Sequence, residues 1–270
     1  MAPSSLGRPL RRAHGIAHRW LPRLPRATAG TDVAAAALGA EVVTVLGDSH
    51  ALVFRAIARQ HLVPKTWFDL VVVRGATARG LINPNSATDA RRRFHAALRP
   101  VPRTRKTVVM LGEVDCGFLV WHRSQERGTS VDAELDQSLS AHTDFLDGLL
   151  ESGRRRLCVV SAIVPTVWDY ATWAGLSNRR KEVRAGIHER TAATVAYNAR
   201  LRAWADARDV PYLDLDRVTL DASTGVVREC FRNSDAQDHH LDRNRLAAAI
   251  AEEMSSLTWP PPGGERRPVR

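Results

Sequence analysis

A short segment near the start of the chain combines groups that could carry chemistry. Residues 47–50 read Gly-Asp-Ser-His and directly follow the apolar run 42–46. A serine hydroxyl is a weak nucleophile until an adjacent imidazole takes its proton. Ser49 is therefore a candidate nucleophile. The simpler alternative is that Ser49 caps a helix, because serine is common where a strand passes into a helix.

An Asp-His-His triplet at 238–240 holds the second set of candidate groups. Either histidine could act as a general base, and the aspartate of the triplet or Asp235 could hold that base in the correct tautomer. Together with Asp48 and His50, the triplet could instead bind metal. A metal-dependent phosphoesterase needs several spaced carboxylates and imidazoles around one or two ions.

Apolar runs predict five strands that alternate with helices. The runs are continuous, as expected for strands that are covered on both faces. We expect strands at 41–47, 69–74, 106–111, 156–164 and 210–215, and helices at 51–61, 89–98, 131–151, 189–208 and 241–257. Strands separated by helices predict an α/β domain with a parallel sheet and helices on both faces.

The predicted sheet gathers the candidate residues at one edge. In parallel sheets the reactive groups lie beyond the carboxyl ends of the strands. Ser49 follows the first predicted strand, Gly75 follows the second, and residues 112–115 follow the third. All three loops should therefore face the same crevice.

Four segments, in order, resemble the conserved blocks of the SGNH/GDSL hydrolases. Residues 43–50 (Val-Thr-Val-Leu-Gly-Asp-Ser-His) resemble the first block and Gly75 the second. Residues 112–115 (Gly-Glu-Val-Asp) align with the third block, and 238–241 (Asp-His-His-Leu) resemble the last. The resemblance covers roughly residues 42–255. Gly-Asp-Ser-His together with Gly-Glu-Val-Asp-Cys is similar to a variant subgroup of that family.

The resemblance implies a three-layer, flavodoxin-like sandwich with a five-stranded parallel sheet. It also implies roles for single residues. Ser49 would be the nucleophile, and its own N–H and that of Gly75 would donate to the oxyanion. His240 would be the base, because a leucine follows it as in the family, and Asp238 would orient it. His239 is the alternative base.

Two positions depart from the family pattern. The third block usually supplies an asparagine donor, and Asp115 stands in its place; an ionised carboxylate cannot donate. The family's aspartate three residues before the histidine is also missing, because Gln237 occupies that position relative to His240. Glu113 and His50 are expected to lie beside the site. These departures keep open a binding or accessory protein that has the fold without turnover.

The resemblance predicts an esterase or O-acyltransferase that forms an acyl-Ser49 intermediate on a small-molecule or carbohydrate ester. It predicts no cofactor and no metal; the metal-dependent phosphoesterase is the alternative. Three aromatic residues after the fourth strand could form a sugar-stacking wall or simply pack beneath their loop: Trp168, Tyr170 and Trp173.

The net charge of +10 is concentrated at the chain ends. Residues 1–40 hold six arginines and one aspartate, and residues 260–270 hold three arginines and one glutamate. A basic face on the folded part would indicate nucleic-acid binding, whereas basic ends do not. We therefore expect no nucleic-acid partner. We expect a flexible arm at 1–40, one α/β domain at 41–259 and a disordered tail at 260–270.

The composition also indicates the cellular compartment of the protein. No apolar run is long enough to span a membrane, and the basic N-terminus lacks the apolar region of a secretory signal. We therefore predict a cytoplasmic protein without a membrane partner; an arginine-rich transit peptide is the alternative. The cysteines, Cys116, Cys158 and Cys230, form no Cys-x-x-Cys pair and suggest neither a disulfide framework nor zinc. The oligomeric state is not predicted.

Overall fold

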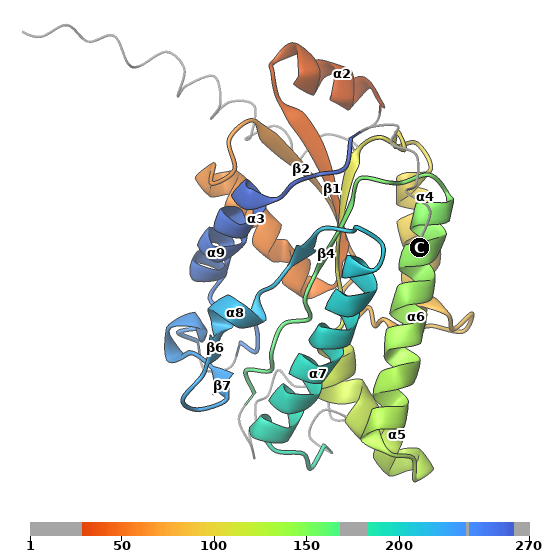
Figure 1. Ribbon diagram of the computed structural model, residues 1–270, viewed down its shortest axis with the longest axis vertical. Helices are drawn as coiled ribbons and strands as arrows, with labels where there is room; N and C mark the ends of the chain where they lie inside the picture. The colour runs from red at the N-terminus through yellow and green to blue at the C-terminus, as the bar shows by residue number, and fades with distance from the viewer. Residues whose placement is uncertain (1–28, 168–182, 236–237, 262–270) are drawn as a thin grey trace, which may run out of the picture.

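The computed structural model describes residues 29–167, 183–235 and 238–261, and the centre of this part is a five-stranded sheet (Figure 1). All four strand pairs are parallel, in the order β2-β1-β3-β4-β5. The strands are β1 (Glu41–Gly47), β2 (Thr66–Val72), β3 (Lys106–Met110), β4 (Leu157–Val160) and β5 (Tyr212–Leu213). The predicted flavodoxin-like order is confirmed.

Each face of the sheet contributes to a separate hydrophobic core. On β1, Val43 and Val45 belong to one core and Leu46 to the other, because successive side chains of a strand point to opposite faces. All three residues are essentially inaccessible to solvent. The continuous apolar runs of the sequence therefore mark strands that are covered on both faces.

Two helices cover the first face. They are α3 (Val53–Gln60) and α9 (Arg243–Ser256). Phe54 and Ile57 of α3 pack with Leu246 and Ile250 of α9 against the strands. Asp242 caps α9 by accepting hydrogen bonds from the second and third residues of the helix, at 3.0 and 2.9 Å. This cap, two residues after the triplet 238–240, fixes where α9 begins.

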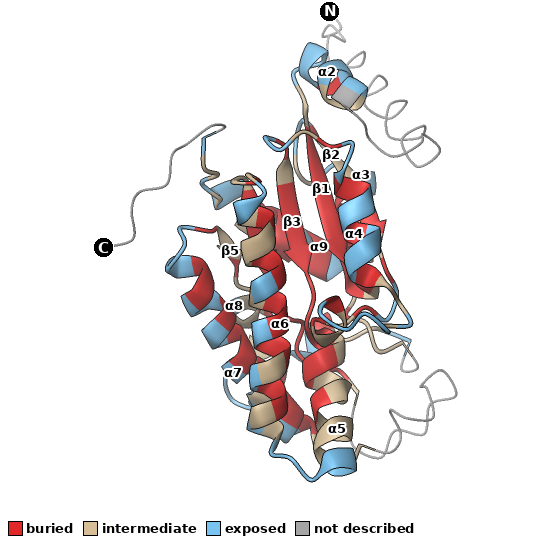
Figure 2. Cartoon of the chain, turned by 90° about the vertical axis from the view of Figure 1, so that its right-hand side faces the viewer, coloured by how far each residue is buried: buried red, intermediate tan, exposed pale blue. Residues whose placement is uncertain are grey.

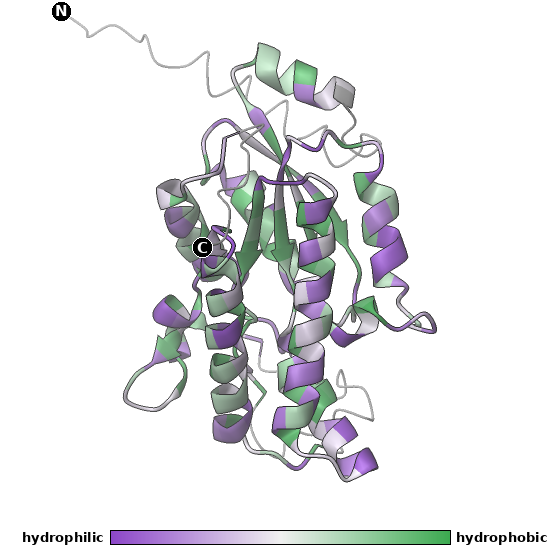
Figure 3. Cartoon of the chain, turned by 45° about the vertical axis from the view of Figure 1, so that its right-hand side comes forward, coloured by the Kyte–Doolittle hydropathy of each residue, from purple (hydrophilic) through white to green (hydrophobic). Residues whose placement is uncertain are grey.

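Three helices of the described chain cover the opposite face: α4 (Ala90–Leu98), α6 (Val131–Glu151) and α7 (Ile187–Asp206). Their buried residues and those of the strands form one continuous interior (Figure 2). Their outward sides are mostly hydrophilic, whereas the strands between the layers are hydrophobic (Figure 3). Ser130 caps α6 as its hydroxyl accepts the N–H of Ala133 at 3.1 Å.

Several short elements were not predicted. A π-helical turn, Asp115–Leu119, follows β3 and runs into α5 (Val120–Arg127). Beyond β5 lie α8 (Asp216–Thr219) and a hairpin of β6 (Leu220–Asp221) and β7 (Val226–Val227). Apolar periodicity missed α5 because Val120 is its only buried residue, so the helix carries no apolar stripe.

The folded part begins before residue 41, where the predicted arm ends. Residues Ala29–Ala37 form the helix α2, and its Asp32 accepts a hydrogen bond of 2.8 Å from Nε of the buried Arg105. Arg105 also lies 3.6 Å from Asp69 of β2. These contacts tie α2 to the sheet. The predictions for 1–28 and 262–270 lie outside the described residues.

At the other end of the described chain, Trp259 packs against the core of the α3/α9 face. The Lys106 ammonium group lies 4.9 Å from its ring centroid. Within the described ranges, no helix is both long and apolar enough to cross a membrane.

Candidate active site

Ser49 lies at the start of a short 3-10 helix, Ser49–Leu52, directly beyond β1. Asp48 is the cap of this helix, because its Oδ1 accepts the N–H of His50 at 2.8 Å. The alternative role of Ser49 as a helix cap is therefore taken by its neighbour. The Ser49 side chain is half-buried and its hydroxyl faces another segment of the chain.

Gly47 allows the ends of β1 and β3 to approach closely in front of Ser49. A Cβ at this position would lie 2.6 Å from the Met110 carbonyl oxygen and 2.6 Å from the Ala51 Cβ. Neither atom is the flexible end of a side chain, so any larger residue would displace the backbone. The first glycine of the 47–50 segment thus sets the position of the serine two residues later.

The hydroxyl of Ser49 lies in a chain of side-chain hydrogen bonds. Ser49 Oγ is 3.0 Å from His240 Nε2, and His240 Nδ1 is 2.6 Å from Asp238 Oδ1. Asn233 Nδ2 donates to the other carboxylate oxygen of Asp238 at 3.0 Å. The structure thus brings together Ser49, His240 and Asp238, although Ser49 and His240 are 191 residues apart in the sequence.

The two-residue spacing from Asp238 to His240 is compatible with this contact because the backbone folds into a tight turn. The His240 N–H donates to Asp238 Oδ1 at 2.9 Å, which places the imidazole of the same residue against the same oxygen. The three-residue spacing of the family is therefore not required. Asn233 was not predicted, and no motif in the sequence indicates it.

The electrostatic setting favours a neutral His240 beside an ionised Asp238. Burial lowers the pKa of His240 below its usual 6.5, and the electrostatic interaction with His50 acts in the same direction, against the attraction of Asp238. Burial opposes the ionisation of Asp238, but the hydrogen bonds from His240 outweigh it and lower the Asp238 pKa. An ionised Asp238 only accepts, so Nδ1 carries the imidazole proton and Nε2 accepts from Ser49.

A second Asp-x-His turn faces the first. Asp48 Oδ1 accepts the N–H of His50 and also lies 3.1 Å from its Nδ1, as Asp238 does with His240. Glu113 Oε2 lies 3.8 Å from the same Nδ1. The His50 ring is buried, and its centroid is 4.6 Å from that of His240. Glu113 therefore lies against His50, whose ring lies beside that of His240.

His239 packs against the other two imidazoles rather than against the serine hydroxyl. Its ring centroid is 4.1 Å from that of His240 and 6.0 Å from that of His50. Its backbone carbonyl accepts the hydroxyl of Thr166 at 2.5 Å, which ties the 238–240 turn to the segment after β4. The histidine that contacts the Ser49 hydroxyl is His240, through its Nε2.

Asp115 differs from the expectation that it lies where an oxyanion donor belongs. Its carboxylate is fully buried and accepts the backbone N–H groups of Ala78, at 2.6 Å, and Arg79, at 3.0 Å. Burial raises its pKa to about 6, against these hydrogen bonds. Asp115 thus acts as an acceptor that anchors the loop after β2, and this loop carries Gly75.

Two glycines allow the loops beyond β2 and β3 to reach the site. Gly75 has φ +70°, a left-handed conformation that glycine adopts without steric cost. Gly112 has φ +115°, and a Cβ there would lie 2.8 Å from Ala162 Cβ and 3.1 Å from Tyr197 Cε1. Gly112 therefore requires glycine, whereas the conformation of Gly75 favours it.

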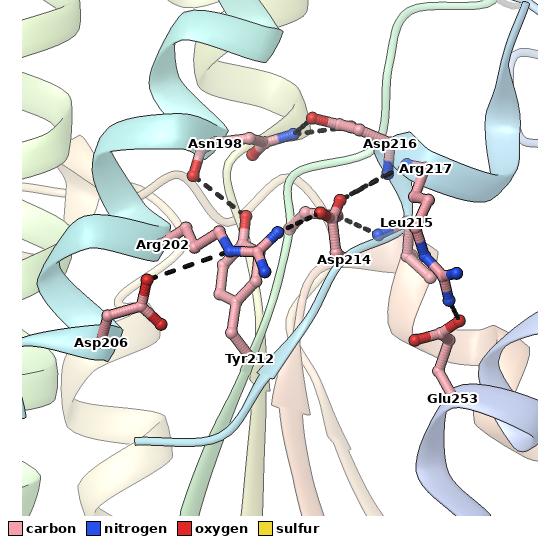
Figure 4. Close-up of polar contacts among 10 residues, drawn as sticks. Asn198, Arg202, Asp206, Tyr212, Asp214, Leu215, Asp216, Arg217 and Glu253 are labelled. Carbon is pink, nitrogen blue, oxygen red and sulfur yellow. Dashed lines mark hydrogen bonds and ion pairs between the residues drawn. The ribbon is translucent and has the colours of Figure 1, made fainter. Parts of the chain in front are cut away.

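A polar network joins α7 to β5 and to the segment that follows β5 (Figure 4). Asn198 of α7 accepts from the backbone N–H of Ala162 at 2.8 Å and donates to its carbonyl at 2.9 Å. The same side-chain amide donates to Asp216 at 2.9 Å, and the Tyr212 hydroxyl donates to the backbone carbonyl of Asn198 at 3.1 Å. Burial raises the Asp216 pKa to about 6, against the hydrogen bond from Asn198. This network fixes the segment that continues to Thr166.

Two overlapping groups of described side chains could hold a metal ion. One is His50, His239 and His240, and the other is Asp48, His50 and Glu113; within each group the ligand atoms lie within 4.8 Å of one another. The second group is buried throughout, whereas His239 and His240 are partly exposed. The predicted aromatic wall of Trp168, Tyr170 and Trp173 lies outside the described residues.

Solved structures share this architecture. One, named an acylhydrolase, from Bacteroides fragilis, is 11% identical and has a TM-score of 0.51; the match covers 94% of this chain and 97% of the other. Another, named a GDSL-like lipase, from Bacteroides thetaiotaomicron, is 12% identical with the same TM-score and covers 90% and 97%. The chain has the fold of the GDSL-like hydrolases. No family model and no curated protein matches it.

Replacing Asp115 by asparagine tests its role as a buried anchor. The pKa of Asp115 in the folded chain is about 6, above its ordinary value of 3.8. Between about pH 4 and pH 6, the folded chain therefore keeps a proton on Asp115 that the unfolded chain has lost. Wild-type stability should therefore fall relative to Asp115→Asn as pH rises from about 4 to 6. The relative change should be on the order of 3 kcal/mol, measured by urea unfolding at several pH values.

The matched control is Asp144→Asn, which removes an exposed carboxylate from α6. Its free energy of unfolding should stay within about 0.5 kcal/mol of wild type. A difference between wild type and Asp115→Asn that is constant across this pH range would contradict the assignment.

Proposed function

We propose that the chain is a serine-dependent esterase or O-acyltransferase that forms an acyl-Ser49 intermediate. The observation that supports this most strongly is the continuous contact from Ser49 Oγ through His240 to Asp238, at 3.0 and 2.6 Å. A serine, an imidazole and a carboxylate in this order are the groups that acyl transfer requires. The shared fold with structures named GDSL-like lipase and acylhydrolase agrees with it.

In the proposed reaction, Ser49 Oγ attacks the ester carbonyl carbon while His240 Nε2 takes its proton. Asp238 stabilises the imidazolium that results and keeps Nδ1 protonated. The carbonyl oxygen becomes an oxyanion, which accepts the backbone N–H groups of Ser49 and Gly75. The leaving alcohol then takes the proton from His240, and the acyl group remains on Ser49.

The second half of the reaction decides between hydrolysis and transfer. Water or an acceptor hydroxyl loses its proton to His240 and attacks the acyl carbon, and Ser49 leaves with the proton. The proposed substrate is a small-molecule or carbohydrate ester, which can reach the partly exposed Ser49. Asp115 supplies no donor in this scheme and acts by holding the Gly75 loop.

Hydrolysis of p-nitrophenyl acetate by the full chain tests the proposal. Ser49→Ala should lower kcat at least about a thousandfold, because the nucleophile is lost. Asp238→Asn should lower kcat by up to about ten-thousandfold, because an amide favours the wrong imidazole tautomer. Both proteins should keep the circular dichroism spectrum of the wild type.

The matched control is Ser140→Ala, which removes an exposed hydroxyl from α6 and should leave kcat unchanged. Hydrolysis by Ser49→Ala at the wild-type rate would refute the serine mechanism.

The acid limb of the pH profile of kcat/KM should report His240. Its pKa lies below 6.5 because of burial and the electrostatic interaction with His50, opposed by Asp238 and Glu113. Only the neutral imidazole accepts the proton of Ser49, so activity should be lost as pH falls through this lowered pKa. His50→Gln removes the interaction with His50 that lowers the His240 pKa and should move the acid limb to higher pH. An unchanged or downward-shifted limb would contradict this coupling.

A further inference from the structure

The three imidazoles at the site form a cluster that the proposed reaction uses only in part. His50, His239 and His240 each contribute one ring nitrogen to this cluster, and these three nitrogens lie within 4.8 Å of one another. The proposed acyl transfer needs a single base, His240. The tight gathering of two further imidazoles around that base therefore calls for a separate explanation.

The carboxylates behind two of these rings contact the same nitrogen, Nδ1. Asp238 takes Nδ1 of His240 at 2.6 Å, and Asp48 lies 3.1 Å from Nδ1 of His50. Nε2 is therefore the nitrogen of both rings that can bind a metal ion. A carboxylate that holds the far nitrogen of a ligating imidazole is the usual support of a zinc ligand, since it fixes the tautomer and raises basicity.

The surroundings also suit a divalent ion of the zinc type. Neutral imidazoles favour zinc, copper, nickel or cobalt, whereas magnesium and calcium prefer oxygen ligands. Asp48, Asp238 and Glu113 lie behind the rings and supply negative charge. His239 and His240 are partly exposed, so an ion can reach this group, unlike the buried group of Asp48, His50 and Glu113. Zinc–nitrogen bonds of about 2.1 Å require only a modest closing of the three rings.

We infer that His50, His239 and His240 bind one zinc ion, and that this ion inhibits the enzyme by taking the nitrogen that Ser49 needs. His240 Nε2 has one lone pair, which accepts the Ser49 hydroxyl at 3.0 Å in the metal-free site. A bond from that lone pair to zinc breaks the Ser49 hydrogen bond, and the proton stays on Ser49 Oγ. The ion therefore removes the base without altering the covalent structure.

The inhibition rests on the proposed function, whereas the metal site does not. Two measurements on the full chain, freed of metal with EDTA, separate them: calorimetric titration with zinc chloride, and the rate of fluorophosphonate labelling at the same zinc concentrations. We expect one zinc per chain and labelling that slows at least tenfold as the site fills. Cobalt(II) should give the visible absorption of a low-symmetry site with nitrogen ligands.

Variants locate the ion. His239→Gln and His50→Gln should each weaken zinc binding at least tenfold, and Asp48→Asn should weaken it by about 10–100-fold through its support of His50. Ser49→Ala should bind zinc at least as tightly as the wild type, because the competing hydroxyl is gone. The matched control is His188→Ala, which removes an exposed imidazole from α7 and should bind like the wild type.

The outcomes are distinguishable. Absence of zinc binding, or binding that His239→Gln and His50→Gln leave unchanged, would overturn the site. Zinc-stimulated ester hydrolysis by Ser49→Ala would overturn the inhibitory role, because the ion would then perform the chemistry. One bound zinc that His239→Gln weakens, in a chain that hydrolyses no ester, would support the site and contradict the proposed function.

Discussion

The contact of Asp238 with the backbone and the imidazole of His240 constrains the site more than any other interaction. One carboxylate oxygen takes both the N–H and Nδ1 of the same residue, at 2.9 and 2.6 Å. This turn sets the tautomer and the direction of the ring together, so Nε2 points to Ser49. Asn233 holds the other oxygen of Asp238, and the cap at Asp242 begins α9 directly behind the turn.

The fold brings the serine to this imidazole through close backbone packing. Gly47 allows β1 and β3 to end side by side, where a methyl group would lie 2.6 Å from a carbonyl oxygen. Asp115 pins the loop after β2 from the end of β3, and Asn198 holds the end of β4 from α7. Buried polar groups that are fully hydrogen-bonded favour one arrangement of these loops over others.

The sequence predicted the architecture well because the apolar runs record burial. It predicted the ends of strands less well, because residues remain buried beyond the last hydrogen-bonded pair of a strand. Val210 and Leu215 are buried, yet β5 spans only Tyr212–Leu213. The helix α5 was missed because it buries a single residue.

At the candidate site, the motifs identified the residue types but not their directions. In the structure, Ser49 contacts His240 and His240 contacts Asp238. Alignment placed Asp115 at the donor position, and only the structure shows it accepting N–H groups from residues 36 and 37 positions earlier. Asn233 belongs to no motif, and its contact depends on how the 233–238 segment folds.

The central claim is that Ser49 is the nucleophile and that the turn of Asp238 and His240 activates it. The most direct measurement is mass spectrometry of the full chain, with peptide mapping, after reaction with a fluorophosphonate. The account predicts one adduct, on Ser49, that forms much more slowly in Asp238→Asn. An adduct on another residue, or none in a preparation that hydrolyses esters, would contradict it.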